Sequence, residues 1–298
     1  MKFCLNIFFV ACTALLFNGC ASMTACYSPE RRIHAAPMSF NLKYNTVSFK
    51  STDGTRLKGW FVPAIIQPRA TIIFLHGRTG NMAEHFPAVA WLPRRGFNVF
   101  LFDYRGYGGS RGRPSPEGVY LDSMSAVEYI RSRMDVRKDR LILFGQDMGA
   151  ANAILAAARD PLKHSNRGAI RAVIAEAPYS SCTDICTGFF GGISALFAGD
   201  EDYSPKDYVK KISPTPLLLV HGDSDRTVSP EHSRKLYELA DEPRRLWTVK
   251  GGGHIDAFTT HGETYRAKLE SFIYRALSMS PATHTRKSSS ESKSRVAK

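Results

Sequence analysis

The sequence predicts an α/β fold over residues 40–277, with a mostly parallel central sheet and helices on both of its faces. Short apolar runs alternate along the chain with helical segments of about 10–15 residues, which is the order typical of a parallel sheet. The apolar runs are also nearly continuous, as in strands that are buried on both faces. Functional groups are then expected at the carboxyl ends of the strands, where open α/β sheets bind their ligands.

The first two expected strands, residues 45–50 and 56–62, alternate apolar and polar residues around an Asp-Gly pair, which is a hairpin signal. Continuous apolar runs predict the later strands, and Pro116 and Gly96 mark a helix start and a helix end. The remaining elements are expected, in order, as a strand at 71–75, a helix at 83–95, a strand at 97–102, a helix at 117–133, a strand at 140–144, a helix at 148–158, strands at 170–175 and 217–220, a helix at 230–240, a strand at 246–249 and a helix at 263–277.

The chain has 298 residues, of which 43% are hydrophobic and 22% are charged. This composition is that of a globular protein and excludes a fibrous, low-complexity or disordered one. Lys and Arg total 40 against 27 Asp and Glu, which gives a formal net charge of +13. The excess is spread along the chain. It suits an anionic membrane surface or acidic partners, or reflects a generally basic proteome, and no nucleic-acid motif accompanies it.

Residues 1–19 resemble a secretory signal peptide. Lys2 is followed by an apolar stretch over residues 3–17, which is too short to span a bilayer as a helix, since about 20 residues are needed. The segment that ends in Gly19 and Cys20 resembles a bacterial lipobox, so Cys20 is the expected site of a lipid anchor; cleavage after Ala25 is the alternative. Both predict export, and the first predicts a membrane-anchored lipoprotein of the bacterial cell envelope.

Two further segments are expected to lie outside the folded domain. Residues 20–39 are expected as a linker, and residues 278–298, rich in Ser, Lys and Arg, as a disordered basic tail. Cys182 and Cys186 are four residues apart, so they form either a disulfide or two thiols. No spacing of Cys and His suggests a zinc site, and no metal or organic cofactor is expected.

Unusual polar residues follow four of the predicted strands, at 76–81, 145–149, 221–225 and 251–254. Since the carboxyl ends of parallel strands meet at one edge of a sheet, these four segments are expected to build one site.

These segments resemble the motifs of the α/β-hydrolase family, nearest its compact serine-hydrolase branch of monoacylglycerol-lipase-like and depalmitoylase-like enzymes. Residues 103–110 are similar to that branch's loop after the fourth strand, and His76-Gly77 opens a segment similar to its oxyanion loop. Asp225 and His254 stand where the family has its acid and its base. The order of nucleophile, acid and histidine is also that of the fold. The resemblance covers residues 40–277 and implies the α/β-hydrolase fold with a short cap at 178–214.

The nucleophile departs from the family pattern. The family's elbow is Gly-x-Ser-x-Gly, and this chain has Asp147 in the Ser position, with small residues still around it. The resemblance implies a triad of Asp147, Asp225 and His254, with His254 as general base. It also implies that the backbone N–H groups of Arg78 and Met148 form the oxyanion hole.

Four interpretations of this site remain open. In the first, the chain is an esterase-, lipase- or thioesterase-like hydrolase of a small-molecule or lipid-like substrate. In the second, Asp147 attacks the saturated carbon of an epoxide or alkyl halide, and His254 and a water hydrolyse the resulting ester. In the third, an ion pair between Asp147 and His254 has ended catalysis, and the chain is an envelope binding protein. In the fourth, Ser180 or Ser181 is the nucleophile.

Other residues of these motifs have structural interpretations. Asp103, Arg105 and His221 are expected to order their loops, and four histidines are expected at the surface: His85, His164, His232 and His261. The predicted cap contains three tyrosines that are candidates to polarise an epoxide oxygen: Tyr179, Tyr203 and Tyr208.

Overall fold

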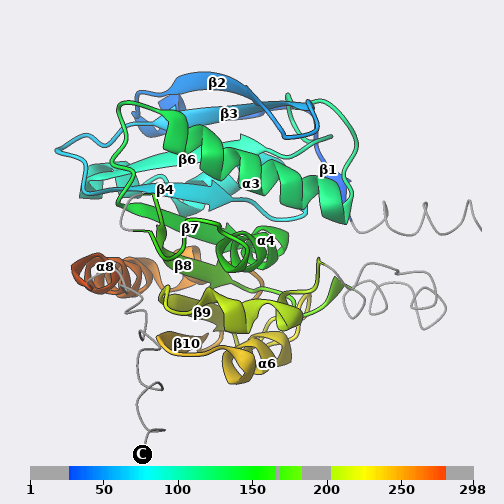
Figure 1. The fold of residues 1–298 in the computed structure, drawn as a ribbon, viewed down its shortest axis with the longest axis vertical. Coiled ribbons are helices and arrows are strands. Elements are labelled where there is room, and N and C mark those ends of the chain that lie inside the picture. Colours follow the sequence, from blue (N-terminus) through cyan, green and yellow to red (C-terminus); the bar gives the residue numbers. More distant parts are fainter. Residues whose placement is uncertain (1–26, 166–167, 183–202, 280–298) are drawn as a thin grey trace, which may run out of the picture.

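The computed structural model describes residues 27–165, 168–182 and 203–279. These residues form an eight-stranded sheet in the order β10-β9-β8-β7-β4-β6-β3-β2 (Figure 1). Its strands are β2 (Asn45–Lys50), β3 (Arg56–Val62), β4 (Ala70–Leu75), β6 (Phe97–Asp103), β7 (Leu141–Gln146), β8 (Ile170–Glu176), β9 (Leu217–Gly222) and β10 (Arg244–Val249).

The sheet is mostly parallel, as predicted. β2 and β3 form the expected antiparallel hairpin, and β3 also pairs antiparallel with β6. Every later neighbour, from β6 to β10, pairs in parallel. The carboxyl ends of β4, β7, β8, β9 and β10 therefore lie along one edge, where the sequence places its unusual polar residues.

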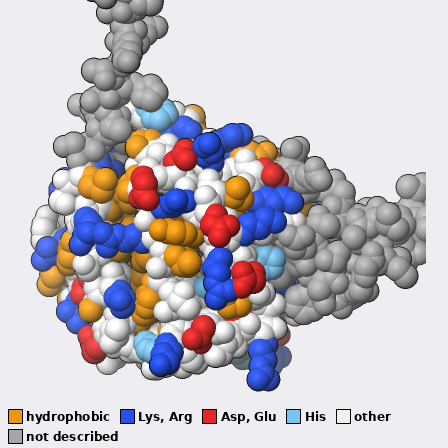
Figure 2. Space-filling view, turned by 90° about the horizontal axis from the view of Figure 1, so that it is seen from below, with side chains coloured by type: hydrophobic (Ala, Val, Ile, Leu, Met, Phe, Trp, Pro, Cys, Tyr) orange, Lys and Arg blue, Asp and Glu red, His pale blue; other side chains and the backbone are white. Residues whose placement is uncertain are grey.

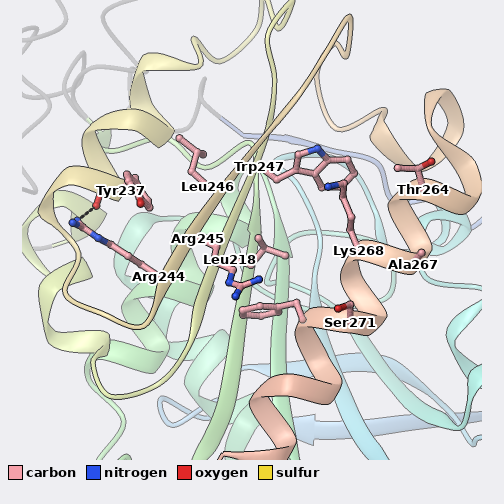
Figure 3. Close-up of a pocket in the computed structure, with 11 residues that line it drawn as sticks. Leu218, Tyr237, Arg244, Arg245, Leu246, Trp247, Thr264, Ala267, Lys268 and Ser271 are labelled. Atoms are coloured by element: carbon pink, nitrogen blue, oxygen red, sulfur yellow. Dashed lines mark hydrogen bonds between the residues drawn. The ribbon is translucent and has the colours of Figure 1, made fainter.

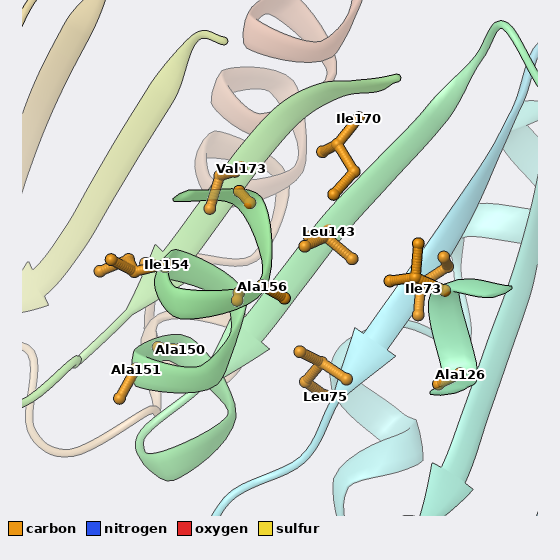
Figure 4. Close-up of a cluster of buried hydrophobic side chains, with 14 of the residues drawn as sticks. Ile73, Leu75, Ala126, Leu143, Ala150, Ala151, Ile154, Ala156, Ile170 and Val173 are labelled. Carbon is orange, nitrogen blue, oxygen red and sulfur yellow. The ribbon is translucent and has the colours of Figure 1, made fainter. Parts of the chain in front are cut away.

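Helices cover both faces of the sheet (Figure 1). α3 (Pro116–Ser132), α4 (Met148–Ala158) and α6 (Glu231–Leu239) share one apolar cluster with Ile73, while α8 (Gly262–Ser278) shares the other cluster with Phe74. Successive residues of β4 thus point to opposite clusters, as the geometry of a strand requires. Figure 4 shows the first cluster, where the alanines of α4 let the helix lie close against β4, β7 and β8.

The expected helix at 83–95 is wrong. The segment instead forms three short pieces: α2 (Met82–His85), the 3₁₀ turn η2 (Phe86–Ala88) and the 3₁₀ turn η3 (Leu92–Arg95). Pro87 and Pro93 explain the difference, because proline has no N–H for a helical hydrogen bond and its ring clashes with the preceding turn.

The described residues before β2 pack on the domain. β1 (Ser28–Pro29) pairs in parallel with β5 (Thr79–Gly80), and Asn81 Nδ2 donates to the carbonyls of Glu30 and Arg32 at 3.2 and 2.8 Å. This part of the expected linker thus holds the loop that follows β4. The other short elements are η1 (Pro37–Phe40), η6 (Pro205–Asp207), η7 (Val209–Ile212) and α7 (Ala257–Thr260).

Arg105 has the loop-ordering role predicted for it. Its guanidinium donates to the fully buried Asp122 at 2.7 Å and to Asp53 at 2.8 Å, so it joins the loop after β6 to α3 and to the β2–β3 turn. Within the described ranges, no helix combines the length and the apolarity that a membrane crossing requires.

Candidate active site

The three predicted triad residues meet at the carboxyl edge of the sheet. Asp147 lies between β7 and α4, Asp225 follows β9, and His254 follows β10. His254 Nδ1 lies 2.8 Å from Asp225 Oδ2, and His254 Nε2 lies 3.8 Å from Asp147 Oδ1. Segments that are far apart in the sequence thus bring two carboxylates to the two ring nitrogens of one histidine.

The backbone at Asp147 has the strained geometry of a nucleophile elbow. Its φ of 53° and ψ of −115° lie in a region that side chains rarely adopt, at a typical cost of about 1–3 kcal/mol. A Cβ on Gly149 would collide with the carbonyl of Leu75, and one on Gly145 with the carbonyl of Gly149. The small residues around Asp147 are therefore required by the turn, which presents the carboxylate at the N-terminus of α4.

Asp225 is fixed as a hydrogen-bond acceptor. Its Oδ1 accepts from the backbone N–H groups of Thr227 and Val228 at 2.8 and 2.9 Å. Burial favours the neutral carboxyl, but hydrogen bonds from His221 and His254 outweigh this effect and lower the pKa of Asp225 below its ordinary range. The turn itself is held by His221, whose Nε2 lies 2.9 Å from the Val228 carbonyl, in agreement with the predicted role of His221.

His254 is held toward its charged form. Burial lowers its pKa, but the hydrogen bond to Asp225 and the negative charge of Asp147 act in the opposite direction, and the net pKa is raised. The ring nitrogen that faces Asp147 is therefore a proton donor at neutral pH more often than in an ordinary histidine.

The strongest contact of Asp147 is with Arg78. The backbone N–H of Arg78 donates to Asp147 Oδ2 at 3.0 Å, its Nε donates to the same oxygen at 3.1 Å, and its Nη2 donates to Oδ1 at 2.9 Å. The two side chains are 8% and 3% exposed, so the pair is buried. The forked guanidinium meets both carboxylate oxygens, which is the strongest common geometry of such a pair.

This pair changes the predicted oxyanion hole. The backbone N–H of Arg78, one of the two expected donors, already donates to Asp147 itself. Met148, whose N–H is the other expected donor, is the buried first residue of α4 and directly follows Asp147. The carboxylate of Asp147 thus occupies the position where an ester's developing oxyanion would bind.

A second buried carboxyl lies behind the elbow. Glu176, the last residue of β8, accepts from Gln146 Nε2 at 2.9 Å and from the Tyr265 hydroxyl at 2.8 Å, and its backbone carbonyl accepts from Asp147 N–H at 2.9 Å. Burial raises the pKa of Glu176, although these two side-chain bonds act against it. His85 extends the network through Gln146 Oε1 at 3.1 Å, so the expectation that His85 lies at the surface is wrong.

Glu176 and the side chain of Arg78 were not predicted as parts of the site. Glu176 had one available signal, since it is a carboxylate at the carboxyl end of a buried apolar run. Arg78 had another, because a cation directly after His76-Gly77 complements a carboxylate in the elbow. Both signals depend on the topology that brings the strand ends together.

The alternative nucleophile and the cap tyrosines lie in other contacts. Ser180 Oγ lies 2.9 Å from His232 Nδ1, which belongs to α6 and is not the predicted base. Arg159 stacks over Tyr208 at 4.2 Å and over Tyr203 at 5.4 Å. Tyr179 is buried, and burial mainly raises the pKa of its hydroxyl, with the charge of Asp147 among the smaller contributions.

Several predicted features lie outside the described residues. These are Cys20, the signal segment, Cys186 and the basic tail from residue 280, so the lipid anchor and the disulfide stay predictions. The first residue of the predicted tail, Ser278, is instead the last residue of α8. In the described ranges, no group of three or more His, Cys, Asp or Glu side chains is arranged to hold a metal ion.

The buried pair of Arg78 and Asp147 predicts a large effect on stability. Arg78→Leu leaves Asp147 buried without its cation, and the free energy of unfolding should fall by about 3–5 kcal/mol. The double variant Arg78→Leu/Asp147→Ser also removes the unpaired carboxylate, so it should recover most of the lost free energy of unfolding, as measured by urea denaturation. Arg137, in an exposed pair with Asp139, is the matched control, for which Leu should cost about 0–1 kcal/mol. Equal losses in the single and double variants would contradict this account.

The raised pKa of His254 gives a second prediction. In an NMR titration, the His254 ring should titrate above pH 6.5 in the wild type. Asp225→Asn should lower the pKa of His254, because it removes the negative charge that counters the effect of burial. Since the folded pKa exceeds the unfolded value, this contact stabilises the fold below about pH 6.5 and is lost as the pH rises through the folded pKa. Asp223→Asn, an exposed change in the same turn, should leave the titration unchanged. An identical His254 titration in Asp225→Asn and wild type would refute the assignment.

Comparison with known proteins gives the family. Residues 66–190 match the family model described as serine aminopeptidase, S33. YfhR of Escherichia coli K12 is 44% identical over 256 residues, which are 84% of this chain and 87% of YfhR. The protein bem46 of Schizosaccharomyces pombe is 30% identical over 76% of this chain and 74% of its own. The esterase Pf2001 of Pyrococcus furiosus shares the fold, with a TM-score of 0.71 at 22% identity over 84% of this chain and 99% of that one. The chain therefore belongs to the α/β-hydrolase family.

Proposed function

We propose that this hydrolase uses the Asp147 carboxylate as its nucleophile at a saturated carbon, with epoxides and alkyl halides as its substrate classes. The observation that carries the proposal is the hydrogen bond from the backbone N–H of Arg78 to Asp147 Oδ2 at 3.0 Å. This bond fixes one carboxylate oxygen and leaves Oδ1 on the side of His254. Ester hydrolysis is less well supported, because the same bond fills the oxyanion position and because carboxylate attack on an ester would give an anhydride.

In the first step, Oδ1 forms a bond to the substrate carbon while the carbon–halogen or carbon–oxygen bond breaks. The leaving atom departs as halide or alkoxide, and Asp147 becomes a neutral alkyl ester. Arg78 Nη2 donates to Oδ1 at 2.9 Å and orients this oxygen for the attack. For an epoxide, the hydroxyl of Tyr179 is the candidate proton donor to the alkoxide.

In the second step, His254 takes a proton from water, and the water oxygen attacks Cγ of the Asp147 ester. The negative charge that develops on Oδ2 is stabilised by the backbone N–H of Arg78, so the retained oxyanion donor serves the enzyme's own ester. The alkyl oxygen leaves and takes the proton from His254. Alkylation also removes the charge of Asp147 that raises the pKa of His254, so the base becomes neutral when it is needed.

The proposal predicts a trapped intermediate. His254→Ala, incubated with 1,2-epoxyhexane or 1-bromohexane, should gain one alkyl group on the peptide that contains Asp147, because the ester forms but is not hydrolysed. Asp147→Asn should gain none, and the control His261→Ala should turn over both compounds. In a single turnover of the wild type in H₂¹⁸O, the label should enter Asp147 rather than the product. The absence of an adduct, together with ester hydrolysis by the wild type, would contradict the proposal.

A catalytically silent binding protein is the second candidate, favoured by the same closed ion pair of Arg78 and Asp147. The two candidates separate in Asp147→Ser. If the wild type turns over no epoxide, haloalkane or ester and Asp147→Ser hydrolyses short acyl esters, then the site is an intact hydrolase frame that the carboxylate has closed.

We also propose that the chain is exported and held at a membrane of the cell envelope through Cys20, on the support of the signal-like segment and the lipobox-like residues before Cys20. In cells fed labelled palmitate, the wild type should carry the label in the membrane fraction, because acylation of Cys20 anchors the chain. Cys20→Ala should lose the label and the membrane association, whereas Cys182→Ser should keep both. Equal labelling of Cys20→Ala and wild type would refute the anchor.

A further inference from the structure

A large groove lies at the edge of the sheet, away from the triad. It has a volume of about 690 Å³ and is formed by β10, the edge strand, together with α8 and α6. Figure 3 shows Lys268 and Ser271 reaching it from α8, and Tyr237 from α6, on the two sides of β10. A volume of this size is typical of small-molecule sites.

The groove has an apolar part on the face of the sheet that α8 covers. Leu218 and Phe272 are buried there, and Trp247 of β10 is half-buried and packs in the same cluster. Figure 2 shows the face of the molecule that contains this edge, with apolar side chains grouped between Lys and Arg side chains and some acidic ones. An exposed apolar surface of this kind marks a binding site more often than a scattered surface leucine does.

The charges that line the groove are all positive. Arg245 is exposed, and Lys268 Nζ lies 5.0 Å from the centre of the Trp247 ring. Arg244 is already hydrogen-bonded, because its guanidinium donates to carbonyls at the end of α6, including that of Glu238 at 3.0 Å. Arg245 and Lys268 are therefore the cations available to a ligand, and no Asp or Glu is among the residues that line this groove.

Among the described residues, three carboxylates of α8 and of the turn before β10 lie in ion pairs with other arginines. Glu263 and Glu270 of α8 lie 3.7 and 3.8 Å from Arg95, and Glu242 lies 3.5 Å from Arg244. The positive charge of Arg245 and Lys268 is thus not neutralised from the helix that forms the wall.

We propose that this groove binds a single-chain aliphatic carboxylate, with its alkyl chain along Leu218, Trp247 and Phe272 and its carboxylate at Arg245 and Lys268. Charge complementarity selects this occupant over the two others that the chain itself offers. The sequence after Met279 has five basic residues and one acidic residue, and a second copy would bring the same cations, so both would be repelled. A carboxylate between Arg245 and Lys268 gains charge-assisted hydrogen bonds while its chain leaves water.

The test uses the full chain in phosphatidylcholine nanodiscs and a decanoate that carries a photoreactive diazirine at its alkyl end. Labelling should saturate and should map to peptides that contain Trp247 and Phe272. Unlabelled decanoate should compete, while decyltrimethylammonium should not. Arg245→Ala/Lys268→Ala should raise the half-saturating concentration at least tenfold, and the matched control Arg137→Ala/Lys138→Ala, at two exposed cations of another loop, should not change it.

Three outcomes would overturn the proposal: equal competition by the cationic analogue, unchanged labelling of the Arg245→Ala/Lys268→Ala variant, or a dimer in which β10 is cross-linked to β10. Circular dichroism of this variant shows whether it is folded, so lost labelling is interpretable. Asp147→Asn should label like the wild type, which separates this site from the proposed catalytic reaction.

Discussion

The buried ion pair between Arg78 and Asp147 is the contact on which the rest of the site depends. A carboxylate that is 2% exposed at the tip of an elbow would be costly without a cation, and Arg78 supplies that cation with a forked, three-bond contact. Arg78 must in turn be held in place. Its carbonyl accepts from the Tyr107 hydroxyl at 2.7 Å and from the N–H of Ser28 at 3.0 Å. The loop after β6 and the strand before the domain thus position the pair, which explains why these peripheral segments pack so closely against the oxyanion loop.

The site is a row of alternating charges: Arg78, Asp147, His254 and Asp225. Each carboxylate in this row stabilises the positively charged form of the side chains beside it, so removal of one charge changes the pKa values of its neighbours. Asp147 lies 2.9 Å from Arg78 and 3.8 Å from His254, and Asp225 lies 2.8 Å from His254. A reaction that neutralises Asp147 would therefore weaken the contact with Arg78 and remove one of the charges that raise the pKa of His254, whereas a reaction elsewhere in the pocket would leave both in place.

Much of the fold could be predicted from the sequence because its signals are local. The continuous apolar run at residues 71–75 and the Asp-Gly turn between β2 and β3 gave strands close to those of the structure. The predicted helix at 83–95 was wrong because Pro87 and Pro93 interrupt the segment. The positions of Asp147, Asp225 and His254 were found through motif order. The contacts of Arg78, His85 and Glu176 were not, since they join strand ends that are brought together only by the sheet topology.

In the proposed mechanism, the elbow can keep its geometry although Asp147 stands in the position of the family's serine. A serine enzyme needs the Arg78 N–H for the oxyanion of its substrate, while a carboxylate nucleophile needs the same N–H for the oxyanion of its own ester. In the proposed mechanism, the geometry that holds Oδ2 at 3.0 Å from this nitrogen would serve a new first step and would keep the oxyanion donor for the second. In this mechanism His254 and Asp225 would likewise keep one task, the activation of water against an enzyme-bound ester. The ester itself would differ, because its acyl carbon would be Cγ of Asp147, the residue by which this chain departs from the family's elbow, instead of a carbon of the substrate.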